Sequence, residues 1–169
     1  MSTQIELFTV AIEHKEKALD AMRRFALPQA KAELQVAQEI DPSLADVKTL
    51  LQATEFLTEL GLNAKTRASG LARAWTIIRD TRSTLAGTVH SILETLTCER
   101  ILHLLPADYA DFVDSAEKSL HVGYCCLVLN RFEEAHQKLF RLFDQPLRGV
   151  SSQAVGLLWG CLLQIASSR

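Results

Sequence analysis

Apolar residues recur along most of this chain at steps of three and four, the spacing that places side chains on one face of an α-helix. The first stripe covers residues 8–25. It comprises Phe8, Ala11, Ile12, Lys15, Ala18, Leu19, Met22 and Phe25. No segment shows the two-residue alternation of a half-buried strand. The pattern therefore predicts an all-α protein without a sheet.

Turn-forming residues divide the pattern into separate helices. Leu27-Pro28 ends the first stripe and begins a second helix, because proline disfavours helix at the residue before it and suits a first helical turn. Asp41 or Ser43 is the expected N-cap of a third helix, which ends at Gly61. Five more helices are expected to begin near residues 63, 83, 108, 132 and 152, with stops at Pro106 and Asn130. About eight helices joined by short links predict antiparallel neighbours in a single domain, residues 1–169.

Small residues mark two places where helices of a hairpin would pack closely. In the stretch around NRFEEA, the small residues are Gly123 and Ala135, the turn aromatic is Phe132, and Leu139 is the large apolar residue. This stretch resembles the hinge of a tetratricopeptide repeat (TPR), a unit of about 34 residues with two antiparallel helices. The resemblance covers residues 116–149.

A second match to the same family covers residues 11–44. Its small residues are Ala18, Ala30 and Ala37, its large apolar residue is Leu34, and Pro42 closes the unit. The resemblance implies helix hairpins stacked as a right-handed superhelix, because a single hairpin cannot bury both of its faces. A helical bundle unrelated to the family is the alternative architecture. The helix expected at 83–105 falls between the two matches and breaks their register.

The resemblance implies a scaffold that binds another protein and is not an enzyme. In stacked repeats the first helices line a concave groove, which suits a partner peptide or helix. The expected lining residues are Glu117, Leu120, His121, Tyr124 and Leu127, with Lys15 from the first match. A small chaperone for a secreted or assembling client protein is an alternative function.

Composition and charge narrow the choice of partner. The net charge is -2 and the sequence pI is about 6.2, so no basic surface favours nucleic acid or an anionic membrane. The four cysteines form no CxxC motif and are expected to be buried thiols in a reducing compartment. The start of the chain lacks the features of a signal peptide, and the most apolar segment, 154–166, is too short to span a bilayer. These observations predict a cytoplasmic protein.

Candidate chemistry along the chain is sparse. No nucleophile elbow and no glycine-rich phosphate loop occurs, so neither catalysis nor a cofactor is expected. His121 with Cys125, and Glu99 with His103, are pairs of metal-ligand type, but zinc needs three or four ligands. A sensor or metal-dependent enzyme built on a helical bundle, with a pocket near His90, Cys98 and His103, is the remaining alternative. Arginines cluster around Trp75, which is itself expected in the core.

The last predicted helix, AVGLLWGCLLQIA, is apolar on all sides. Terminal repeats usually carry a polar outer face. The pattern therefore predicts self-association or a continuation of the chain. The expected oligomer surface comprises Val155, Leu158, Trp159 and Leu162.

Overall fold

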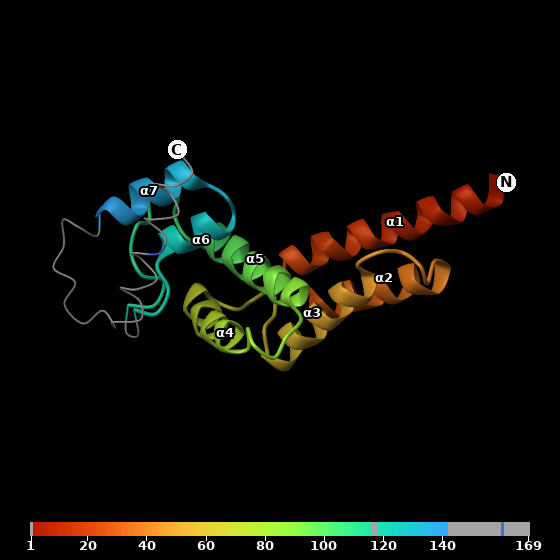
Figure 1. Ribbon diagram of the computed structural model, residues 1–169, viewed down its shortest axis with the longest axis horizontal. Coiled ribbons are helices and arrows are strands. Elements are labelled where there is room, and N and C mark those ends of the chain that lie inside the picture. Colours follow the sequence, from red (N-terminus) through yellow and green to blue (C-terminus); the bar gives the residue numbers. More distant parts are fainter. Residues whose placement is uncertain (1, 116–117, 142–159, 161–169) are drawn as a thin grey trace. The chain divides into compact units, whose positions relative to one another are not determined.

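The computed structural model describes residues 2–115 and 118–141 together with Gly160, and over these residues it contains helices and no strand (Figure 1). The helices are α1 (Ser2–Arg23), α2 (Leu27–Ile40), α3 (Val47–Glu59), α4 (Ala68–Asp80), α5 (Gly87–Leu104), α6 (Val122–Val128) and α7 (Phe132–Phe140). The all-α prediction is confirmed for this part of the chain. The helix expected from residue 152 lies, apart from Gly160, outside the described residues.

The chain divides into two compact units. The first unit contains the residues up to 66 together with 82–96, and the second contains 67–81 together with the residues from 97 onward. α1, α2 and α3 therefore belong to the first unit, whereas α4, α6 and α7 belong to the second. The boundary falls inside α5.

Alanine-rich faces join α1 to α2 in the first unit. Ala11, Ala18 and Ala21 of α1 and Ala30 and Ala37 of α2 are fully buried. Their small side chains allow the two backbones to approach closely, as the sequence predicted for this hairpin. Larger buried side chains fill the rest of this core and extend it to α3: Met22, Phe25, Leu27, Leu34, Val47, Leu50 and Leu57.

Polar contacts lie at the edges of this three-helix arrangement. His14 Nδ1 lies 2.6 Å from Glu33 Oε2, which links α1 to α2. Lys31 Nζ donates to Glu55 Oε1 at 2.9 Å and links α2 to α3. His14 therefore has a hydrogen-bonding partner although it lies between apolar positions of the first stripe.

Left-handed residues terminate three helices. Phe25 (φ 57°), Gly61 (φ 70°) and Asn130 (φ 57°) each follow a helix. In each case the next N–H bonds to the carbonyl five residues earlier, as the Ala26–Ala21, Leu62–Leu57 and Arg131–Cys126 pairs show at 2.9, 3.1 and 2.8 Å. This is the Schellman arrangement, which satisfies carbonyls at a helix end. The predicted stops at Gly61 and Asn130 are confirmed.

Three helices begin later than the sequence pattern predicted. Neither Asp41 nor Ser43 caps α3, because Asp41 Oδ1 instead accepts from the Ser43 N–H at 2.9 Å. Asn63 likewise forms a turn, in which its Oδ1 accepts from the Lys65 N–H at 2.9 Å. Such local bonds compete with helix formation. α3, α4 and α5 therefore start at Val47, Ala68 and Gly87, each three to five residues after the predicted position.

The predicted sixth helix is wrong over most of its length. Among its described residues, only Val122–Val128 is helical. Before it, Phe112 forms an isolated antiparallel bridge with His121, and the Val113 N–H donates to the Leu120 carbonyl at 2.8 Å. The Tyr109 hydroxyl donates to the Phe112 carbonyl at 2.6 Å, which further holds this backbone out of a helix.

Candidate functional site

The α6–α7 hairpin packs tightly at Gly123. A Cβ atom added to Gly123 would lie 2.5 Å from Cγ and 2.9 Å from Cδ2 of Leu139. Leu139 is buried and Ala135 is fully buried. Gly123 is thus packed tightly against a side chain of α7, and Ala135 is buried, as expected for small residues inside the hairpin.

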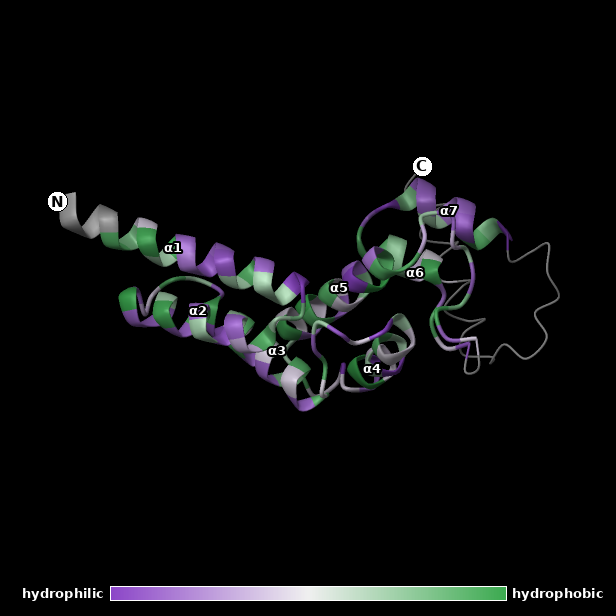
Figure 2. Cartoon of the chain, turned by 180° about the vertical axis from the view of Figure 1, so that it is seen from behind, coloured by the Kyte–Doolittle hydropathy of each residue, from purple (hydrophilic) through white to green (hydrophobic). Residues whose placement is uncertain are grey.

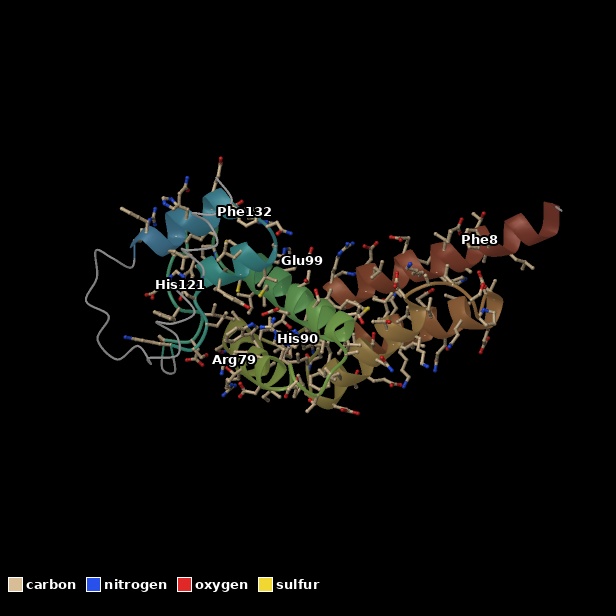
Figure 3. All side chains as sticks on the ribbon, in the orientation of Figure 1. Phe8, Arg79, His90, Glu99, His121 and Phe132 are labelled. Carbon is tan, nitrogen blue, oxygen red and sulfur yellow. The ribbon has the colours of Figure 1, made fainter. Side chains whose placement is uncertain are left out.

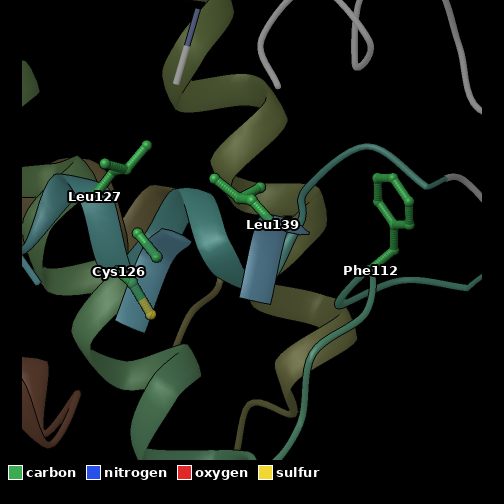
Figure 4. Close-up of a cluster of buried hydrophobic side chains, with 5 residues drawn as sticks. Phe112, Cys126, Leu127 and Leu139 are labelled. Carbon is green, nitrogen blue, oxygen red and sulfur yellow. The ribbon is translucent and has the colours of Figure 1, made fainter. Parts of the chain in front are cut away.

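A buried apolar cluster surrounds this contact. It comprises Phe112, Cys126, Leu127, Ala135 and Leu139 (Figure 4), with Leu102, Tyr124 and Phe132 packed against it. Phe132, labelled in Figure 3, is partly buried and follows the left-handed Asn130, as the predicted turn aromatic should. Cys126 has a pKa raised to about 11, chiefly because burial disfavours the thiolate.

His121 caps α6 from within this core. Its Nδ1 accepts from the Gly123 N–H at 3.0 Å, so in the neutral ring the proton resides on Nε2. The ring is 2% exposed and meets Phe112 edge-on, with centroids 5.2 Å apart. Burial lowers the pKa of His121 to about 4, although the charge of Asp111 and the Ala110 carbonyl act in the opposite direction. His121 is therefore neutral at pH 7.

Lys138 ties α7 to the irregular segment before α6. Its Nζ donates to the Ala107 carbonyl at 2.8 Å and to the Tyr109 carbonyl at 2.6 Å.

We expect Lys138→Met to lower the free energy of unfolding by about 1 kcal/mol, because methionine keeps the apolar stem but removes both hydrogen bonds. Urea titration measures this loss against Lys48→Met, which removes an exposed lysine of α3. Equal stability of the two variants would contradict the assigned role of Lys138.

The residues predicted to line a concave groove do not form one open surface among the described residues. Leu120, His121 and Leu127 are buried, at 1%, 2% and 6% exposure, so they do not line an open groove in this structure. Tyr124 is half-buried and meets Trp75 edge-on, with centroids 5.3 Å apart. Lys15 belongs to the first unit and Glu117 lies outside the described residues. The predicted oligomer surface, Val155, Leu158, Trp159 and Leu162, also lies outside them.

Lys15 is engaged at the turn before α3. Its Nζ donates to the Ala45 carbonyl at 3.3 Å and lies 3.8 Å from Asp46 Oδ2. The structure thus gives Lys15 a role within the first unit, holding α1 against the link between α2 and α3.

The N-terminal half of α1 exposes an apolar surface, of which the sequence pattern had placed Phe8 and Ile12 on the buried face. We call it the α1 patch: Leu7, Phe8, Val10 and Ile12, with exposed fractions of 52%, 50%, 38% and 36%. It forms the apolar band beside the grey N-terminal turns of α1 in Figure 2, and Figure 3 labels Phe8. The patch lies within six successive residues, so it surrounds much of the helix circumference. Ala11, within the same segment, is fully buried.

A cleft of about 360 Å³ lies beside α3 in the first unit. We call it the α3 cleft. Its lining residues are Gln52, Glu55, Phe56 and Glu59 from α3, and Thr84, Leu85, Ala86 and Val89 from the start of α5 and the residues before it. No motif in the sequence pointed to this cleft. The only signal was the spacing of the four α3 residues, which places them on one helix face.

In the described part of the chain, no group of three or more His, Cys, Asp or Glu side chains could hold a metal ion. His90 and Cys98 of α5 are buried whereas His103 is exposed (Figure 3 labels His90). Cys98, Cys125 and Cys126 are buried cysteines, as predicted. No described helix has the length and apolarity needed to cross a bilayer.

Trp75 occupies the core of the second unit, as predicted for the aromatic within the arginine cluster. It is 1% exposed, and the Arg79 guanidinium lies 5.0 Å from its ring centroid (Figure 3 labels Arg79). Arg79 also pairs with Asp80 at 3.1 Å. This arginine is thus engaged within the helix.

Comparisons with protein-family models, with curated proteins and with solved structures find no match to this chain. The residues themselves therefore carry the functional argument, and the two open surfaces of the first unit, the α1 patch and the α3 cleft, are its candidate sites.

Proposed function

We propose that this protein is a non-enzymatic scaffold of TPR-like helix hairpins that binds an apolar segment of another protein. The TPR-like architecture is supported by close helix packing at Gly123 and by the full burial of Ala30 and Ala135. These are the small-residue positions on which the resemblance depends. The proposed partner is a peptide or helix, because the exposed surface is a helix face rather than an enclosed pocket.

The α1 patch carries this proposal. Isolated exposed apolar side chains are ordinary, but Leu7, Phe8, Val10 and Ile12 are contiguous and each is at least 36% exposed. A helix that is apolar on several sides is normally covered on those sides. α2 covers only the face that contains Ala11, Ala18 and Met22. A partner segment on the α1 patch would remove the remaining apolar surface from water.

The double variant Phe8→Glu/Ile12→Glu tests the proposal. Both side chains are exposed, so we expect the free energy of unfolding to change by less than about 0.5 kcal/mol. Partner capture should fall by about tenfold or more, because each glutamate would have to be desolvated against an apolar segment. Quantitative affinity purification with mass spectrometry measures capture, and urea titration measures stability.

Ile77→Glu is the matched control. Ile77 is also a large apolar residue and is 48% exposed, but it lies alone on α4. A protein counts as a partner of the α1 patch if the unaltered protein and Ile77→Glu both capture it and the double variant does not. If all three proteins retain the same set, or if none retains any protein, the proposed function is wrong.

A further inference from the structure

The α3 cleft has apolar walls from two separate segments. On α3, Phe56 is half-buried and lies between the lining residues of the neighbouring turns. On the other side, Leu85 is half-buried and Val89 is 3% exposed. The opposite face of α3 is already occupied, since Leu50, Ala53 and Leu57 are buried in the core. The cleft is therefore an outward-facing apolar slot that the core does not fill.

Carboxylates stand on one side of this slot. Glu55 and Glu59 are four residues apart on α3, so they lie on the same face one turn from each other. Glu55 is partly neutralised by Lys31 at 2.9 Å. Glu59 is exposed, and within the described part of the chain no cation pairs with it. No lysine or arginine lines the cleft. The α3 cleft therefore combines the apolar side chains of Phe56, Leu85 and Val89 with two carboxylates of α3.

From this combination we infer that the α3 cleft binds a segment of a partner protein in which an apolar side chain is flanked by lysine or arginine. The apolar side chain enters between Phe56 and Leu85, and the flanking cation pairs with Glu59. A volume of about 360 Å³ is near the lower end of the range for ligand sites, and it accommodates apolar side chains rather than a folded domain. An acidic or purely polar segment would satisfy only one of the two features.

The inference rests on the proposed function, because it supplies the chemistry of a second contact on the same scaffold. The two surfaces differ in character. The α1 patch is apolar and offers no charge selection, whereas the α3 cleft selects sign through Glu59. Binding at the cleft should consequently weaken as salt increases, since exposed ion pairs are screened.

Fluorescence anisotropy with a labelled peptide of alternating lysine and leucine tests the inference on the full chain. Two comparison peptides carry glutamate in place of lysine, or serine in place of leucine. We expect saturable binding of the lysine–leucine peptide, and affinities at least about tenfold weaker for the other two, because each lacks one required feature. Equal affinity for the lysine and glutamate peptides, or no saturable binding at millimolar concentration, would overturn the inference.

Three variants locate the binding site. Glu59→Gln should weaken binding about threefold to fivefold, which is the usual worth of one exposed ion pair. Ala86→Arg, at an exposed lining position, should weaken it about tenfold or more, because it places bulk and positive charge in the slot. Glu39→Gln is the matched control: it removes the same charge from an exposed position of α2 and should leave affinity unchanged. If Glu59→Gln and Ala86→Arg both bind like Glu39→Gln, the cleft is not the site.

The same assay separates this inference from the proposed function. Phe8→Glu/Ile12→Glu leaves every lining residue of the cleft in place and should bind the peptide with unchanged affinity. If the peptides bind without selectivity while partner capture through the α1 patch is retained, only the inference about the α3 cleft is wrong. Absence of any captured partner, with selective peptide binding intact, contradicts the proposed function through the α1 patch and leaves the cleft inference standing.

Discussion

Gly123→Ala is expected to lower the free energy of unfolding by as much as about 2 kcal/mol, although alanine is the better helix former. The added methyl would lie 2.5 Å from Cγ of Leu139, which is buried and held by Phe112 and Cys126 in the same cluster. Overpacking a core costs about 1–3 kcal/mol, and the gain in helix propensity offsets about 1 kcal/mol of it. Urea titration followed by far-UV circular dichroism measures the difference.

A double-mutant cycle with Leu139→Ala identifies the cause. Leu139→Ala alone should cost about 3 kcal/mol, because it removes a buried side chain and leaves a cavity. In that background Gly123→Ala should become clearly less destabilising, or neutral, because the two closest atoms are absent and the only tight neighbour left for the new methyl is His121 Nδ1 at 3.1 Å. A destabilisation of the same size in both backgrounds would show that Gly123 is required for a reason other than contact with Leu139.

This contact also illustrates what the sequence could predict. Small residues followed by a turn residue and an aromatic predict a helix hairpin from neighbouring residues alone, without information on distant segments. Gly123, Asn130 and Ala135 accordingly behave as predicted. Phe25 adopts the same left-handed conformation as Asn130, but phenylalanine carries no such signal. Burial of its ring at 1% exposure holds the conformation in place.

The wrong predictions of helix position arise from interactions that the spacing of apolar residues does not record. The pattern at 108–129 is helical in spacing, yet the Tyr109 hydroxyl and the Asp111 carboxylate bond to the backbone of Phe112 and compete with the helix. Leu120 and His121 are consequently extended and buried instead of lying on a helix face. Competition between local side-chain bonds and a helix is decided by tertiary packing, which spacing alone cannot reveal.

The candidate surfaces were harder to predict than the helices. Phe8 and Ile12 belong to the same stripe as the buried Ala11 and Ala18, and only the path of α2 decides which of them is covered. The α3 cleft depends on residues 84–89 meeting α3 from a distant part of the sequence. Both surfaces arise where a segment has more apolar residues than the neighbouring helix can cover. An apolar pattern predicts that burial is favourable, but it does not specify whether the covering element belongs to the same chain.

Acid should destabilise the second unit through His121. In the unfolded chain the ring titrates near pKa 6.5, whereas burial lowers the folded pKa to about 4. Between these values the unfolded state binds more protons, so stability is complete above about pH 6.5 and falls as the pH approaches 4. The difference between these two pKa values corresponds to a loss of about 3 kcal/mol. Asp111, which raises the folded pKa, and Lys138, which lowers it, are the charged groups that act on the ring.

His121→Asn isolates this effect. Asparagine does not titrate, and its side-chain oxygen can replace Nδ1 as the acceptor for the Gly123 N–H at the start of α6. Its smaller volume will reduce stability at all pH values, so the informative quantity is the difference in free energy of unfolding between about pH 7 and about pH 4.5. That difference should shrink by about 2–3 kcal/mol in His121→Asn and remain unchanged in His103→Asn, which removes an exposed histidine. If acid lowers the free energy of unfolding equally in both variants, the pH dependence comes from other groups. His121 would then contribute through packing alone.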